Sequence, residues 1–317
     1  MSARAYRPRR TTLAVPGSSE RFLAKARQLA ADEVFLDLED AVAPAAKDAA
    51  RHLVVEALRA GGWGAKIRAV RINDAHTRWA YRDVVDVVEQ AGDCVDVLVL
   101  PKTSGPADIA WLHLLLGQLE QASGLPAGRI GIEAQIEDAV GLAAVEAIAA
   151  ASDRLEALVF GPADFMASVG MRSLTVGAQP AGYAGGDAFH YPHMRILVAA
   201  RANGLQAIDG PFAAIGDLAG LQRSAASVAA LGYDGKWVVH PGQIDTVNAE
   251  FSPAQEEYEK AELLLEAYDY YTDRGLGAAT LGGEMIDEAS RKMAMVAAAR
   301  GRAAGLRRTS GFVPPAG

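Results

Sequence analysis

Polar residues end most of the short apolar segments in this sequence, and acids dominate among them. They are Asp37, Glu39, Asp40, Arg71, Asn73, Lys102, Gln135, Glu137, Asp138, Asp164, Asp209 and His240. If these segments bring several carboxylates to one place, the carboxylates repel each other and raise one another's pKa values unless a cation lies among them. The pattern therefore predicts a bound metal ion.

The ligand types favour magnesium. The chain has one cysteine and six histidines, so oxygen ligands dominate. Mg2+ takes one or two protein carboxylates and leaves its other positions to water and substrate oxygens. Glu137 and Asp164 are the predicted pair because they end successive apolar segments. For each carboxylate taken alone, a helix cap or a loop salt bridge is the alternative.

Histidine patterns are weaker signals for a site. His190 and His193 have an HxxH spacing, but Pro192 lies between them and no acidic partner follows at a recognised distance. We interpret them as part of a loop or a helix start. His240 is either a base or a side chain satisfied by neighbouring backbone, since Pro241 and a glycine follow it.

The segment VPGSSERFLAKA, residues 15–26, is a candidate phosphate site. A turn that opens a helix offers free backbone N–H groups and the positive end of the helix dipole. Arg21 and Lys25 are four residues apart, so both can reach one anion from the same helical face. The alternative is that Ser18 or Ser19 is an N-cap followed by two solvated basic residues.

Eight apolar, β-branched segments predict the strands that position these residues. They lie at 11–15, 33–40, 67–73, 95–102, 129–137, 157–164, 205–211 and 235–242. Helical patterns alternate with them, at 20–30, 46–60, 78–91, 106–122, 138–150, 190–203 and 214–231. This alternation predicts parallel strands with right-handed crossovers, and eight such units fit a (β/α)8 TIM barrel better than an open sheet. In that fold the active site lies at the C-terminal ends of the strands.

The pattern changes after residue 250 to helices alone, interrupted by the Gly-rich break GLGAATLGG. We therefore predict a catalytic barrel domain at 1–250 and a C-terminal helical lid at 251–317. A segment this short buries little core by itself. We expect it to dock on the barrel or on a neighbouring subunit.

Composition restricts the partners. The formal charge of -8 argues against nucleic acid or an anionic membrane as the main partner. Neither a signal-type apolar region at the start nor an apolar run long enough for a membrane helix is found, which predicts a cytoplasmic protein. Cys94 is the single cysteine, so an intrachain disulfide and a four-thiolate zinc site are excluded.

Nine motifs follow one another along nearly the whole chain: VPGSSERF, FLDLEDAV, VRIN, LPKT, IEAQIEDAVG, FGPADF, IDGPF, GKWVVHPGQI and GGEMIDEAS. Together they resemble the citrate lyase β-subunit-like family within the HpcH/HpaI aldolase superfamily. The long insertion at 171–191 resembles the malyl-CoA and β-methylmalyl-CoA lyase branch more than the shorter citrate lyase β subunits.

The resemblance implies a Mg2+-dependent carbon–carbon lyase, with Mn2+ as an alternative ion. Such an enzyme cleaves a 3-hydroxyacyl-CoA thioester, such as L-malyl-CoA or β-methylmalyl-CoA, into acetyl-CoA or propionyl-CoA and the 2-oxo acid glyoxylate. The same enzyme forms the thioester by Claisen condensation in the reverse direction. A homotrimer or homohexamer is expected, in which the C-terminal tail completes a neighbour's active site.

The resemblance also assigns roles to residues of this chain. Glu137 and Asp164 match the family's metal ligands, and Glu137 is counted with the catalytic residues. Arg71 matches the arginine that stabilises the enolate. Asp287, near a predicted helix start, matches the acid that exchanges a proton with the enolate carbon. Ser18, Arg21 and Lys25 match residues that bind CoA. Asp37, Glu39 and Asp40 match a segment that contacts metal-bound water.

Several alternatives share these motifs. A malyl-CoA thioesterase would use the same metal, arginine and CoA groove but release free CoA. A citramalyl-CoA lyase would differ by space for one methyl group, a discrimination of roughly 1–3 kcal/mol. A carrier-dependent citrate lyase β-type subunit, or an aldolase acting on free 2-oxo acids, completes the set.

Overall fold

The computed structural model describes residues 6–314, and its contacts divide the chain into two compact units. The barrel unit spans Arg9–Phe251, and the C-terminal unit runs from Ser252 together with the residues just before Arg9. Within the described residues, no helix is long and apolar enough to cross a membrane.

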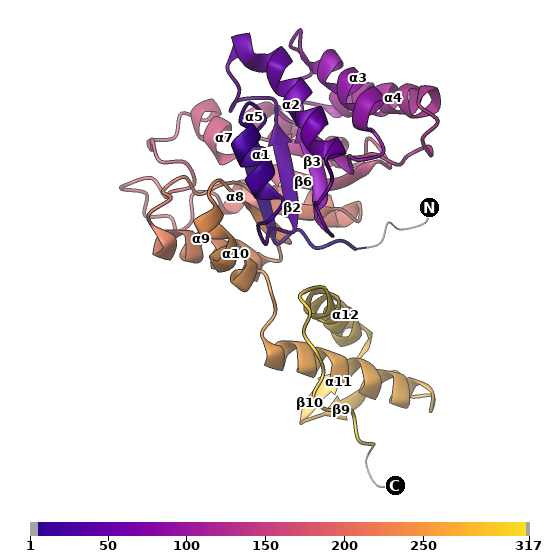
Figure 1. Cartoon of the computed structure of the whole chain (residues 1–317). Helices are drawn as coiled ribbons and strands as arrows, with labels where there is room; N and C mark the ends of the chain where they lie inside the picture. The colour runs from indigo at the N-terminus through magenta and orange to yellow at the C-terminus, as the bar shows by residue number, and fades with distance from the viewer. Residues whose placement is uncertain (1–5, 315–317) are drawn as a thin grey trace. The chain divides into compact units, whose positions relative to one another are not determined.

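Eight parallel strands close into a barrel, in sequence order, with β8 paired to β1 (Figure 1). The strands are β1 Thr11–Pro16, β2 Glu33–Asp37, β3 Ile67–Arg71, β4 Val97–Leu100, β5 Gly131–Ile136, β6 Leu155–Phe160, β7 Gln206–Asp209 and β8 Gly235–Val238. The predicted (β/α)8 barrel is thus confirmed. Most strands end before the predicted segments do, so many of the polar residues lie just beyond the C-terminal ends of the strands.

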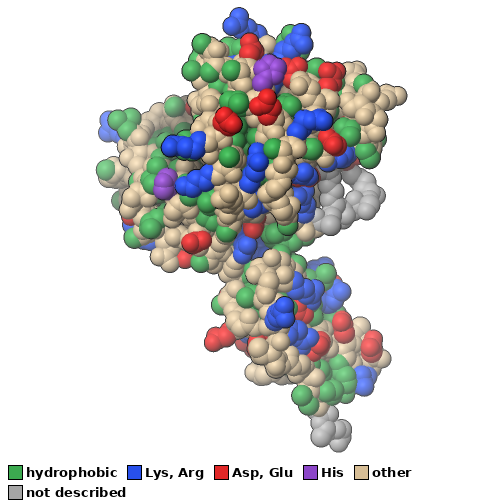
Figure 2. Space-filling view, in the orientation of Figure 1, with side chains coloured by type: hydrophobic (Ala, Val, Ile, Leu, Met, Phe, Trp, Pro, Cys, Tyr) green, Lys and Arg blue, Asp and Glu red, His purple; other side chains and the backbone are tan. Residues whose placement is uncertain are grey.

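Helices follow the strands on the outside of the barrel. They are α1 Glu20–Ala26, α2 Lys47–Arg59, α3 Ala80–Ala91, α4 Pro106–Ala122, α5 Ala139–Ala143, α6 Val145–Ala149, α7 Pro162–Ser168, α8 His190–Ala202, α9 Leu218–Leu231 and α10 Ile244–Glu250, with short 3-10 turns at Pro44–Ala46 (η1) and Pro241–Gln243 (η2). Figure 2 shows Lys and Arg side chains interspersed with acidic ones on the face where α1 and α2 lie.

Three helix predictions need correction. The predicted helix 214–231 begins at Leu218, where Asp217 caps it by accepting from the backbone N–H of Gly220. The predicted helix 20–30 ends at Ala26, where the N–H groups of Gln28 and Leu29 bond three residues back instead of four. Such bonds tighten a last turn and end a helix. The predicted helix 138–150 is two short helices that meet at Ala144.

Strand alternation separates two hydrophobic cores. One cluster contains strand residues only, and therefore fills the barrel: Phe35, Ile67, Ala69, Val97, Val99, Ala157, Val159, Ile208 and Trp237. The neighbouring strand residues, such as Val34 and Leu36, join a larger cluster with the helices. This is the period of two expected when successive side chains point to opposite faces.

The N-terminal end of the barrel is closed by the floor cluster, which we define as Arg9, Glu33, Glu133, Glu156 and Gln206. The Nε group of Arg9 donates to Glu33 and Glu133, at 2.8 Å each. Its Nη2 group donates to Glu156 and its Nη1 group to Gln206. Polar groups at this end of a TIM barrel serve stability rather than catalysis.

The C-terminal unit pairs α11 Gln255–Thr272 with α12 Glu288–Ala303. Small residues let the two helices approach, since Ala261, Ala294 and Ala298 form their own buried cluster. A bidentate ion pair from Arg302 to Glu262, at 2.7 and 2.8 Å, joins the same helices.

The prediction of helices alone after residue 250 is wrong in one place. An antiparallel hairpin begins in the Gly-rich break with β9 Ala279–Leu281 and ends in the segment that follows it with β10 Glu284–Ile286. Gly282 and Gly283 form its turn with φ values of 57° and 87°. Two positive φ angles in succession are what a tight hairpin turn requires and what glycine adopts without strain.

Candidate active site

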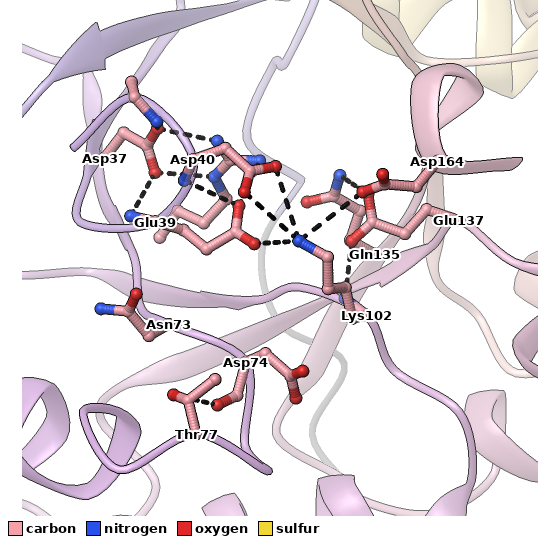
Figure 3. A network of polar contacts seen from close by, with 12 residues as sticks. Asp37, Glu39, Asp40, Asn73, Asp74, Thr77, Lys102, Gln135, Glu137 and Asp164 are labelled. Carbon is pink, nitrogen blue, oxygen red and sulfur yellow. Dashed lines mark hydrogen bonds and ion pairs between the residues drawn. The ribbon is translucent and has the colours of Figure 1, made fainter. Parts of the chain in front are cut away.

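Seven charged side chains meet at the C-terminal ends of five successive strands, β2 to β6. We call them the mouth cluster: Asp37, Glu39, Asp40, Arg71, Lys102, Glu137 and Asp164. Parallel strands that are neighbours in the barrel carry their final residues to the same end, so residues more than a hundred positions apart become neighbours. Figure 3 shows Glu39, Asp40 and Asp164 directed toward the ammonium group of Lys102, and Asp37 directed toward nearby backbone N–H groups.

Asp37 holds Arg71 in a fixed orientation. Its two carboxylate oxygens accept from Nε and Nη2 of Arg71, at 2.7 Å each. Backbone N–H groups of Glu39 and Ala41 donate to the same carboxylate at 2.9 and 3.1 Å. Burial raises the pKa of Asp37, but the charge and hydrogen bonds of Arg71, with these N–H groups, bring it below its ordinary value.

Arg71 keeps donors for a ligand although it is buried. Its guanidinium carbon lies 5.5 Å from the ring centres of both Phe35 and Trp237 inside the barrel. Besides the two bonds to Asp37, its Nη1 atom lies 3.3 Å from Glu39. A guanidinium carries five N–H groups, so these contacts leave part of the fork unused.

Glu137 is buried and held by neutral partners. The backbone N–H of Lys102 donates to Oε1 at 2.6 Å, and the side-chain amide of Gln135 donates to Oε2. Burial raises the pKa of Glu137 to about 8. The backbone of Gly161 passes so close that a Cβ there would lie 2.3 Å from the Cβ of Glu137. A glycine is therefore required at position 161, a constraint that the sequence alone did not reveal.

Lys102 lies at the centre of the mouth cluster (Figure 3). Its ammonium group pairs with Glu39, and lies 3.4 Å from Asp40 and 3.6 Å from Asp164. Burial lowers the pKa of Lys102, yet the hydrogen bond and charge of Glu39 raise it more, so the net pKa is above normal. Sequence analysis found Lys102 at a strand end but assigned it no role.

The donor set of Glu137 and Asp164 fits a magnesium ion. Both oxygens of Glu137 accept from N–H groups only, so lone pairs remain on each oxygen for a cation. The side chain of Asp164 is 43% exposed and contacts Lys102 alone among the ion pairs of residues 6–314. No group of three or more His, Cys, Asp or Glu residues is arranged for a metal in this part of the chain. Two carboxylates with water and substrate oxygens are the ligands Mg2+ commonly takes.

Asp209, a strand-end acid, lies outside the mouth cluster. It accepts from His193 Nε2 at 3.0 Å and from Lys236. Its neighbour Ile208 belongs to the barrel interior, so Asp209 points outward toward α8. Burial raises the pKa of Asp209, but the charges of Lys236 and His193 lower it well below normal.

Other strand-end polar residues are also engaged elsewhere. Asn73 donates to Asp83 at 2.6 Å. His240 accepts from the backbone N–H of Gly242 at 3.1 Å, as a cap of η2, which agrees with the backbone-satisfied alternative. His190 is the first residue of α8.

A family model decides the identity of the chain. The model described as HpcH/HpaI aldolase/citrate lyase matches residues 10–241. The chain belongs to this family.

Relatives along the whole chain agree. An L-malyl-CoA/beta-methylmalyl-CoA lyase from Cereibacter sphaeroides is 39% identical over 298 residues, which cover 92% of this chain and 93% of the relative. Citrate lyase subunit beta from Escherichia coli is 32% identical and covers 97% of this chain and 98% of its own. The structure of CitE from Mycobacterium tuberculosis, in complex with magnesium, acetoacetate and coenzyme A, has 30% identity and a TM-score of 0.71, covering 94% of this chain and 99% of that one. The resemblance to the HpcH/HpaI superfamily that the nine motifs indicate is confirmed.

The family's expected CoA-binding residues lie at the start of α1. Ser19 is the N-cap and accepts from the backbone N–H of Phe22 at 3.4 Å, while Ser18 beside it is exposed. Arg21 and Lys25 are exposed, and neither has a carboxylate partner within residues 6–314. Both cations therefore stay available for an anionic ligand.

Asp287, the family's expected proton-exchanging acid, belongs to the C-terminal unit. It is the N-cap of α12 and accepts from the backbone N–H and the hydroxyl of Ser290, at 2.9 and 3.1 Å. These two hydrogen bonds lower the pKa of Asp287. A capping acid before a helix is structurally ordinary, so local sequence gave no sign of a catalytic role.

Proposed function

We propose that this HpcH/HpaI family member is a magnesium-dependent lyase of 3-hydroxyacyl-CoA thioesters. L-malyl-CoA or β-methylmalyl-CoA would be cleaved to acetyl-CoA or propionyl-CoA and glyoxylate, or formed from them. The names of the relatives and the ligands of the Mycobacterium tuberculosis structure support the substrate class. One observation carries the proposal: Glu137 and Asp164, which fit a hard cation, lie in the same cluster as an arginine fixed by Asp37.

Glu137 and Asp164 are the residues that would hold the metal ion. When bound there, Mg2+ supplies positive charge at the carboxylate and hydroxyl end of the substrate. Mn2+ has the same preference for oxygen ligands and is the alternative ion. Asp37, Glu39 and Asp40 lie across Lys102 from this pair, and the exposed Asp40 is placed to accept hydrogen bonds from water (Figure 3).

Arg71 would stabilise the negative charge that develops on the thioester. The bond between the carbinol carbon and the α-carbon of the acyl-CoA breaks, and its electron pair moves onto the thioester oxygen. The hydroxyl gives its proton to water or to a carboxylate of the mouth cluster and becomes the carbonyl group of glyoxylate. Because Asp37 already fixes Arg71, its unused N–H groups need not reorganise as this charge appears, and preorganised donors of this kind contribute a few kcal/mol each.

Asp287 would exchange the proton at the enolate carbon. Since Ser290 lowers its pKa, Asp287 is ionised at neutral pH and ready to accept a proton from acetyl-CoA in the condensation direction. In the cleavage direction it must first take up a proton, which water exclusion would favour.

We infer that the C-terminal unit of a neighbouring subunit brings Asp287 to the mouth cluster, in a homotrimer or homohexamer. The apolar side chains of Met293 and Val296, three residues apart on one face of α12, are 68% and 54% exposed. Such a face is typical of a helix that docks on another surface.

Arg21 and Lys25 would bind the phosphates of the CoA moiety, with Ser18 beside them. Two unpaired cations four residues apart on an exposed helix suit a polyanionic ligand. These contacts would distinguish a CoA ester from a free 2-oxo acid, because the free acid has no phosphate group to reach them.

A two-product assay tests the proposal. Purified protein is incubated with L-malyl-CoA and Mg2+, glyoxylate is followed as its phenylhydrazone, and free CoA thiol is followed with Ellman's reagent. We expect glyoxylate without thiol, and loss of the signal with a chelator. Thiol without glyoxylate would overturn the proposal in favour of a thioesterase.

A further inference from the structure

Lys102 contacts both of the carboxylates that fit a metal ion. Its backbone N–H donates to Glu137 at 2.6 Å, and its ammonium group lies 3.6 Å from Asp164. The same ammonium group pairs with Glu39 and lies 3.4 Å from Asp40. Three carboxylates therefore surround one cation, a third of which is exposed.

The backbone of Lys102 adopts a conformation that is unfavourable for a residue with a side chain. Its φ angle is 49°, and within residues 6–314 it is the one non-glycine residue with a positive φ. Residues with a Cβ adopt this left-handed region at a free-energy cost, whereas glycine adopts it freely. A glycine would supply the same N–H to Glu137, so what lysine adds at this position is the ammonium group.

The ammonium group and a divalent ion would share Asp164. A metal ion bound to Asp164 draws this carboxylate away from Lys102 and lies near a like charge, and both effects oppose metal binding. Without the metal, the same ammonium group offsets part of the repulsion among Glu39, Asp40 and Asp164.

We propose that Lys102 is a positioning residue that acts as an internal cation, competing with the divalent metal ion for Asp164 and thereby setting the metal affinity of the mouth cluster. The inference rests on the proposed metal site at Glu137 and Asp164. It adds that this affinity is held below what the carboxylates alone would give.

The test measures binding of Mn2+, detected by electron paramagnetic resonance of the free ion, and of Mg2+ by calorimetry. Lys102→Gly keeps the left-handed backbone and the N–H to Glu137 but removes the ammonium group. Lys102→Met repeats the removal with a side chain of similar length. Lys102→Arg keeps the charge. Lys66→Met is the matched control, because it removes one positive charge just before β3, where Lys66 bonds the carbonyl of Arg27.

We expect Lys102→Gly and Lys102→Met to bind Mn2+ and Mg2+ at least about tenfold more tightly than wild type, a change of about 1.4 kcal/mol. Lys102→Arg and Lys66→Met should stay within about threefold of wild type. Circular dichroism in chelator confirms that each variant is folded, so that Lys102→Gly carries the test if Lys102→Met does not fold.

Glu137→Gln separates the two ways in which the idea can fail. If Mn2+ binding depends on Glu137 but Lys102→Gly leaves the affinity unchanged or weaker, the role of Lys102 is overturned while the metal site stands. If wild type binds no Mn2+ in a Glu137-dependent way, the metal site is overturned, and the role of Lys102 with it.

Discussion

Two acidic clusters lie at opposite ends of the same barrel, and they differ in what surrounds them. In the floor cluster, Arg9 is 3% exposed, and Glu33 and Glu133 are fully buried. In the mouth cluster, Lys102 is 33% exposed and Asp164 43%. Carboxylates outnumber cations in both, so composition does not separate them. Access to solvent separates them, because a sealed cluster can only stabilise the fold, whereas an open cluster can exchange its cation for a ligand.

The two clusters also hold their carboxylates differently. Burial, together with the charge of Glu133, raises the pKa of Glu33 well above normal in the floor cluster. Burial also raises the pKa of Glu137 in the mouth cluster, where backbone and amide N–H groups of Lys102 and Gln135 hold it. In the floor cluster, the raised pKa of Glu33 favours a protonated carboxyl group, which reduces the excess negative charge. In the mouth cluster, a bound cation can reduce it.

The largest effect is expected from Arg9→Met in the floor cluster. It would leave Glu33, Glu133 and Glu156 without their cation, and breaking a buried ion pair by removing one partner costs about 3–5 kcal/mol. Urea unfolding followed by circular dichroism measures the free energy of unfolding. Arg195→Met, which removes an exposed pair with Glu146, is the control and should cost about 1 kcal/mol or less. Equal losses in both variants would contradict the special role of the sealed floor.

Glu137→Gln should have the opposite effect: it should lower enzymatic turnover without lowering the free energy of unfolding. Under the proposed function, we expect turnover of L-malyl-CoA to fall at least about 100-fold, since one of the two proposed metal ligands is lost. In chelator, the free energy of unfolding should stay equal or rise, because glutamine still accepts from the Lys102 N–H and carries no charge that burial disfavours. Rate assays and urea unfolding measure the two effects. Wild-type turnover in this variant would refute the assignment of Glu137.

Arg71→Lys tests whether fixed geometry matters in the mouth cluster. Lysine keeps the charge but cannot bond both oxygens of Asp37 and also reach a ligand. We expect kcat to fall about 100-fold, the range found when a preorganised donor is removed, while Mn2+ affinity changes little. Steady-state rates at saturating metal measure the loss. A decrease of less than about threefold would show that charge alone suffices.

The smallest effect is a pH dependence of stability that the floor cluster produces. Because the pKa of Glu33 is raised in the fold, its stabilising contribution is fully present below its unfolded pKa of about 4.3. That contribution is lost as the pH rises through the higher folded pKa. Glu33→Gln should therefore lose less stability than wild type as the pH rises above the unfolded pKa of about 4.3. The difference amounts to roughly 1.4 kcal/mol for each tenfold by which folding strengthens proton binding at Glu33.

Thermal unfolding across that pH range measures the difference. Glu56→Gln, at an exposed position on α2, is the control and should keep the wild-type pH profile. Parallel profiles for wild type and Glu33→Gln would show that the floor cluster holds no proton whose loss matters.

Sequence patterns predicted the barrel because its elements carry local signals. Each strand is a short apolar segment, and each helix an amphipathic one, so the alternation is visible without knowing any contact. The predicted pair Glu137 and Asp164 follows from the same order, since a barrel places successive strand ends together. The hairpin at Gly282 and Gly283 was missed although two glycines between short β-prone segments are themselves a hairpin signal.

The sequence does not show which strand-end residues lie together in the mouth cluster. Asp37 and Asp209 both end apolar strands, yet Asp37 follows the interior position of Phe35 by two, and Asp209 follows Ile208 by one. A shift of one residue turns a side chain to the other face of a strand. Sequence shows the alternation but not which face closes inward.

The architecture, the family and the acidic ends of the strands therefore follow from the sequence alone, because local periodicity and short motifs are enough to reveal them. Only the tertiary structure decided the partners: Arg9 with three glutamates up to 147 positions away, and Lys102 among carboxylates from three segments. Charge pairing acts through space over a few ångströms, and the closure of the barrel sets those distances.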